Sequence, residues 1–111
     1  MKNPIYIAEY VFPGHPDKLS DAIADALVQE ASRREKRALV GVEVAVHRNS
    51  VFITGRIGCT GADEIDVLGI VEDVYRSAGY GGEWKPSPDE LNIQTDLCLG
   101  PLEEEIGRAQ V

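Results

Sequence analysis

The stretch Gly14-His15-Pro16-Asp17-Lys18 decides how the chain is organised. Gly14 can adopt a positive φ and reverse the chain, and Pro16 suits the first turn of a helix. His15 is then the predicted N-cap, and the free N–H groups that follow form an anion site. Lys18 adds a cation and Asp17 a hard oxygen ligand suited to Mg²⁺. The stretch thus indicates a nucleoside triphosphate site. The alternative is a capped helix start with two solvated charges.

The segments around this stretch predict a strand followed by a helix. Residues 5–12 are rich in Ile, Tyr, Val and Phe, as in a β-strand, with Glu9 as the one carboxylate. Residues 17–34 show a helical apolar stripe and end in cations that favour a helix C-terminus. The stripe consists of Leu19, Ile23, Ala26, Leu27 and Ala31.

A β-hairpin is expected next, from two alternating segments at 37–47 and 50–57. A two-residue turn at Arg48-Asn49 fits between them. With that turn Glu43 faces Thr54, and Arg56 lies one diagonal step from Glu43 on the same face. These two opposite charges could neutralise each other across the hairpin.

The remaining elements complete a small domain. Residues 63–78 predict a second helix ended by Gly79, with Ile65, Leu68, Val71, Val74 and Tyr75 as its stripe. Residues 80–90 predict a loop and 91–99 a last strand. The order predicts an α+β fold: a two-layer β-α-β-β-α-β unit, with a mixed sheet and two helices on one face, as a single domain over residues 1–111.

Composition excludes several classes of function. The chain of 111 residues has a net charge of −8, and residues 59–111 are strongly acidic, which argues against binding nucleic acid or anionic membranes. We find no run of apolar residues long enough to span a membrane and no signal peptide, and therefore expect a cytoplasmic protein. Cys59 and Cys98 lack metal-type spacing and are expected to be free thiols.

The run EYVFPGHPDKLSDAIADAL, residues 9–27, closely resembles the opening of S-adenosylmethionine synthetases. That family has a glutamate shortly before E-G-H-P-D-K, followed by a small residue, an aspartate and a helix. Asp21 falls in the place of that aspartate. The resemblance continues through the Glu43 and Gly55 strands to Ala78-Gly79-Tyr80, which is similar to the family's Ile-Gly-Tyr, and weakens afterwards. The family has three such units, and this chain matches the first.

The resemblance implies an activity and roles for individual residues. In the family, methionine attacks the ribose 5′-carbon of ATP and displaces tripolyphosphate, which is hydrolysed to phosphate and pyrophosphate. His15 matches the catalytic histidine at the ATP phosphates, Asp17 a Mg²⁺ ligand and Glu43 the glutamate assigned to K⁺. We expect Lys18 to bind the polyphosphate with His15. A homo-oligomer, dimeric or larger, is the implied state of the full protein.

Three positions depart from the family pattern. Arg56 stands where the family has a glutamate that binds the methionine ammonium. No glutamine in 99–104 matches the one that touches methionine in the family's K-Q-S-P-D-I loop, and Pro13 replaces a glutamate. The partner of ATP is thus expected to be L-methionine or a related acid at an altered site. The alternative from another class is a non-catalytic, stand-alone domain for oligomerisation or ligand binding.

Overall fold

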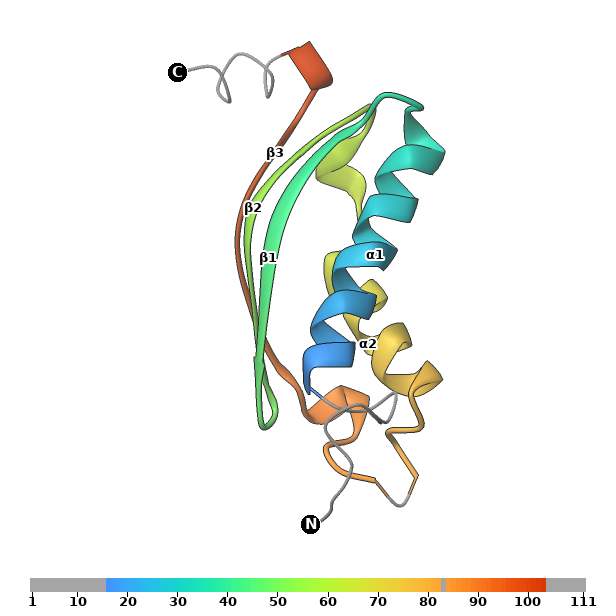
Figure 1. The fold of residues 1–111 in the computed structure, drawn as a ribbon, viewed down its shortest axis with the longest axis vertical. Helices are drawn as coiled ribbons and strands as arrows, with labels where there is room; N and C mark the ends of the chain where they lie inside the picture. The colour runs from blue at the N-terminus through green and yellow to red at the C-terminus, as the bar shows by residue number, and fades with distance from the viewer. Residues whose placement is uncertain (1–15, 83, 104–111) are drawn as a thin grey trace, which may run out of the picture.

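A computed structural model describes residues 16–82 and 84–103 of the chain. It contains two α-helices, α1 (Pro16–Arg34) and α2 (Val67–Ser77), and three strands, β1 (Leu39–His47), β2 (Ser50–Gly58) and β3 (Asn92–Gly100). Both helices lie on the same side of the curved sheet, which makes two layers (Figure 1). The expected α+β class is confirmed. The strand expected at 5–12 lies outside the described residues.

The sheet is mixed, as predicted. Its strand order is β1-β2-β3; β1 pairs antiparallel with β2, and β2 pairs parallel with β3. The hairpin register is confirmed, since Glu43 pairs with Thr54 and Gly41 with Arg56. Arg48 begins the tight turn with φ 57°, a left-handed conformation more often adopted by glycine.

The core lies between the helices and the sheet. α1 contributes most of its predicted stripe, with Leu19, Ile23 and Leu27 buried. Against them pack the inward side chains of the strands, because alternate residues of a strand point to opposite faces. The inward set of the hairpin comprises Val40, Val42, Val44, Val46, Val51, Ile53 and Ile57.

The second helix begins later than the sequence predicts. The expected start at residue 63 is wrong: Ala62–Glu64 forms a separate 3₁₀ turn, Ile65 is extended, and α2 starts at Val67. Asp66 is the N-cap, and its carboxylate accepts a hydrogen bond of 3.0 Å from the backbone N–H of Gly69. This start turns Leu68 outward, where it is 52% exposed, and Val67 inward.

The end of α2 agrees with the prediction. Gly79 follows the helix with φ 102°, and its N–H donates to the carbonyl of Arg76. The N–H of Tyr80 donates to the carbonyl of Tyr75, which completes a Schellman motif. Trp84, beyond this end, stacks edge-on against Tyr80 and remains 48% exposed.

Candidate functional site

The first turn of α1 carries two of the predicted site residues. The helix begins at Pro16, as the sequence predicts, and Asp17 and Lys18 are exposed in its first turn. His15 lies outside the described residues, so its predicted role stays a prediction. The backbone N–H groups of a first helical turn have no intrahelical acceptors, and the helix dipole makes that end positive. This end of α1 therefore suits an anion.

Asp17 meets part of what a Mg²⁺ site requires. Its carboxylate is a hard oxygen donor on the first turn, and Asp21 follows one turn later, also exposed. Mg²⁺ is commonly held by one or two carboxylates together with substrate phosphates and water. Over residues 16–82 and 84–103, no group of three or more His, Cys, Asp or Glu side chains could hold a metal ion. Asp17 thus fits as one ligand whose companions come from phosphate, water or other segments.

Glu43 and Arg56 lie on the outer face of the sheet, which we define as the face turned away from α1 and α2. Strand alternation and the register assign to this face Gly41, Glu43, Ala45 and His47 of β1, Ser50, Phe52, Thr54 and Arg56 of β2, and Asn92, Gln94, Asp96 and Cys98 of β3. Glu43 is exposed and Arg56 is partly buried. The face is mostly polar, in contrast to the valine- and isoleucine-rich inner face.

The expected neutralisation of Arg56 by Glu43 is absent. The two are diagonal neighbours, as predicted, but no ion pair joins them, and Arg56 forms none with any other residue in the described part of the chain. Gly41 pairs with Arg56 on the β1 side, and a methyl group added to Gly41 would meet nothing within 4 Å. Open space therefore adjoins the arginine.

The predicted site residues form two groups within this chain. Asp17 and Lys18 are on α1, which covers the inner face of the sheet (Figure 1). Glu43 and Arg56 are on the outer face. The structure brings together the members of each group, and the sheet stands between the groups. A single site containing all four would need another copy of the chain or further segments.

A hollow of about 470 Å³ lies where β2 and β3 end. Its lining includes Cys59, Gly100 and Pro101. Burial raises the pKa of the Cys59 thiol above its ordinary value, so this cysteine is held in its neutral form. Arg34 of α1 donates a hydrogen bond of 3.0 Å to the carbonyl of Gly61 and so fixes one wall of the hollow.

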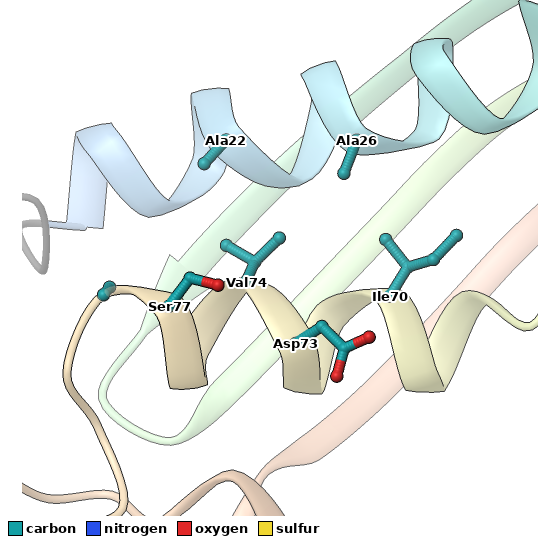
Figure 2. Close-up of a pocket in the computed structure, with 7 residues that line it drawn as sticks. Ala22, Ala26, Ile70, Asp73, Val74 and Ser77 are labelled. Carbon is teal, nitrogen blue, oxygen red and sulfur yellow. The ribbon is translucent and has the colours of Figure 1, made fainter.

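A groove of about 390 Å³ separates α1 and α2. Ala22 and Ala26 of α1 point toward Val74 and Ile70 of α2, as Figure 2 shows. The small alanine side chains leave the groove open, and Asp73 and Ser77 also line it. Sequence analysis did not identify this groove, because facing stripes on two helices become neighbours only after folding.

Asp96 was also missed, although its signal is present in the sequence. Polar residues alternate with apolar ones along β3, with Asn92, Gln94, Asp96 and Cys98 on one side. Such alternation predicts one solvent face. Asp96 pairs with Thr54, so Glu43, Thr54 and Asp96 form one row across the three strands.

Comparison with known proteins gives consistent matches. The family model described as "S-adenosylmethionine synthetase, N-terminal domain" matches residues 3–98. An S-adenosylmethionine synthase of Borreliella afzelii is 36% identical over 78 residues, which cover 70% of this chain and 20% of the relative. One of Mesoplasma florum is 33% identical over 94 residues, 85% of this chain and 23% of that protein. The chain thus spans about a fifth of the length of the curated relatives it matches.

A solved structure supports the same assignment at the level of the fold. An unusual S-adenosylmethionine synthetase from Campylobacter jejuni superposes with a TM-score of 0.68 at 34% sequence identity. The match covers 77% of this chain and 24% of that protein. No helix within 16–82 and 84–103 is both long and apolar enough to cross a membrane.

Proposed function

The chain belongs to the S-adenosylmethionine synthetase family, whose N-terminal domain it matches over residues 3–98, and we propose that the complete protein forms S-adenosylmethionine from ATP and L-methionine or a related acid. Phosphate and pyrophosphate are the other products. The observation that carries this proposal is the match of the family model to most of the chain. The whole protein acts as a cytoplasmic homo-oligomer, a dimer or larger.

Within that enzyme, this domain supplies contacts to the polyphosphate. Support comes from the start of α1 at Pro16, with Asp17 and Lys18 exposed in its first turn. A cation and a helix N-terminus stabilise a leaving group that gathers negative charge more than they stabilise the ground state. His15 contacts the same phosphates and assists departure of the tripolyphosphate.

Two acidic residues are proposed as metal ligands. Asp17 takes part in holding Mg²⁺ against the phosphates, for which its carboxylate and its place beside the anion site are suited. Glu43 serves K⁺, and its exposure on the outer face leaves the carboxylate accessible. When bound, Mg²⁺ supplies neutralisation of phosphate charge.

The methionine site is altered at Arg56. A guanidinium repels the ammonium that a glutamate at this position would attract. No neighbouring carboxylate in the described part of the chain neutralises it, as the absence of an ion pair shows. Binding of methionine in the family's ordinary orientation is therefore weak.

The test uses the longest natural polypeptide that contains this sequence, assayed with ATP, Mg²⁺ and K⁺ for S-adenosylmethionine and by calorimetry for tripolyphosphate. His15→Ala and Asp17→Ala should each lower turnover or polyphosphate binding by about one to three orders of magnitude. Asp25→Ala is the matched control, because Asp25 is an exposed carboxylate of the same helix two turns later.

The outcomes separate the proposal from its alternative. If both variants bind tripolyphosphate and Mg²⁺ like the parent, the start of α1 is a helix cap and no phosphate site. If no S-adenosylmethionine forms although polyphosphate binds, the domain is a ligand-binding unit without the proposed activity.

A further inference from the structure

Arg56 is the one cation on the strand positions of the outer face that is neither at a strand end nor ion-paired within the described residues. It is partly buried, in the centre of a three-stranded sheet, between Gly41 on β1 and Cys98 on β3. A guanidinium has five donors in a planar fork that matches the two oxygens of a carboxylate. Without a protein carboxylate, these donors are available to an anionic ligand.

Asp96 stands beside this guanidinium on the same face. It pairs with Thr54, two residues before Arg56 on β2, so it is a diagonal neighbour of Arg56. Diagonal neighbours on a sheet face lie about 7–8 Å apart, within reach of a long side chain. Asp96 is exposed and has no ion pair to residues within 16–82 and 84–103. The face thus presents one unpaired cation and one unpaired anion at adjacent positions.

We propose that Arg56 and Asp96 form a receptor for a zwitterionic α-amino acid, with the ligand carboxylate on Arg56 and the ligand ammonium on Asp96. This inference rests on the proposed function for its ligand class. It reverses the order of charges that a glutamate at position 56 would impose. Glu43, on the other side of Thr54, is left for the cation already proposed for it.

The shape of the outer face agrees with this arrangement. Gly41 provides no side chain beside Arg56, so the ligand carboxylate can approach the guanidinium from the β1 side. Thr54 lies between Glu43 and Asp96 and presents a hydroxyl that can hydrogen-bond to the ligand. Two opposite charges at fixed places select a ligand by its charges in order, and each matched charge contributes separately to affinity.

The experiment measures binding without nucleotide, by calorimetry, to the longest natural polypeptide that contains this sequence. Three probes share one thioether chain: L-methionine carries both charges, 4-(methylthio)butanoate lacks the ammonium, and 3-(methylthio)propylamine lacks the carboxylate. We expect L-methionine to bind best, the butanoate next and the amine at least about tenfold more weakly than methionine, the usual size of one charged hydrogen bond.

Substitutions then assign each charge. Arg56→Gln should weaken methionine and the butanoate by about tenfold to a hundredfold and leave the amine unchanged. Asp96→Asn should weaken methionine about tenfold and leave the butanoate unchanged or bound more tightly, because a repulsive carboxylate is removed. Arg37→Gln and Asp25→Asn are the matched controls, since both residues are exposed and lie away from the outer face.

Three results would overturn the receptor. They are binding of the amine as tight as that of methionine, methionine affinity within twofold of the parent in Arg56→Gln, or no binding of any probe. Circular dichroism confirms that each variant is folded. The proposed function fails separately, through loss of polyphosphate binding or of S-adenosylmethionine formation, because neither enters this measurement.

Discussion

The two faces of the one sheet differ in almost every property. The inner face carries valines and isoleucines that pack on α1 and α2, and Val51, Ile53 and Ile57 are no more than 1% exposed. The outer face carries Glu43 and Arg56, among other polar groups. Both sets come from the same strands and alternate residue by residue. Packing therefore restricts every second position, and the positions between them are free to carry charge and function.

This division explains how a departure such as Arg56 is tolerated. A substitution on the outer face removes no buried contact, so an acid can become a base there without loss of the fold. A charge on the inner face would be buried among apolar side chains, which costs several kcal/mol unless the charge is paired. Stability is thus expected to depend on the inner face and ligand selection on the outer face.

The largest expected effect is on a residue of the inner face. Ile53→Ala should lower the free energy of unfolding by about 2–5 kcal/mol, because it leaves a cavity where the side chain is 0% exposed. Phe52→Ala, one residue earlier on the outer face, should cost about 1 kcal/mol or less, since Phe52 is 44% exposed. Urea unfolding followed by circular dichroism measures both. Equal losses would show that something covers the outer face in solution.

A pair of glycines tests the same contrast without changing polarity. Gly55 has φ 132°, and a methyl group on it would lie 2.0 Å from the carbonyl oxygen of Gly41. Gly55→Ala should therefore destabilise the domain by about 2–4 kcal/mol, through backbone strain and overlap. Gly41→Ala, where the added methyl meets nothing within 4 Å, should lie within about 0.5 kcal/mol of the parent. A stable Gly55→Ala variant with an unchanged sheet would refute the close approach of the two backbones.

The hairpin could be predicted from the sequence because its alternation and its turn agree. Five apolar residues on one face and two turn residues allow one register, and Glu43 pairs with Thr54 as expected. The start of α2 could not be placed in the same way. Ile65 continues the apolar period of the helix although its backbone is extended, and the capping bond from Gly69 to Asp66 fixes the start at Val67.

The candidate site was only partly predictable. Asp17 and Lys18 were placed correctly in a first helical turn, because Pro16 favours that position and the helix follows it directly. Their separation from Glu43 and Arg56 could not be foreseen. It depends on which face of the sheet the helices cover, and no local pattern near Asp17 encodes that choice.

The smallest expected effect concerns a polar atom on the core side. Tyr75 of α2 is 0% exposed, and its hydroxyl has no hydrogen-bond partner in the described structure. A buried hydroxyl without a partner destabilises the fold because it has lost its bonds to water. Tyr75→Phe should therefore raise the free energy of unfolding by about 1 kcal/mol. Tyr80→Phe is the control: its ring packs against Tyr75 at 5.1 Å, its side chain is only partly buried, and no gain is expected.

The same hydroxyl predicts a pH dependence that separates it from other effects. Burial raises the pKa of Tyr75 from its ordinary value of 10.0 to about 12. The unfolded chain therefore releases this proton first, and the stability that the neutral group contributes is complete below pH 10.0 and is lost as the pH rises to about 12. Tyr75→Phe has no such group, so its advantage over the parent should widen across this interval. A constant advantage would show that the hydroxyl reaches water, and the inner face would then be less dry than its apolar side chains imply.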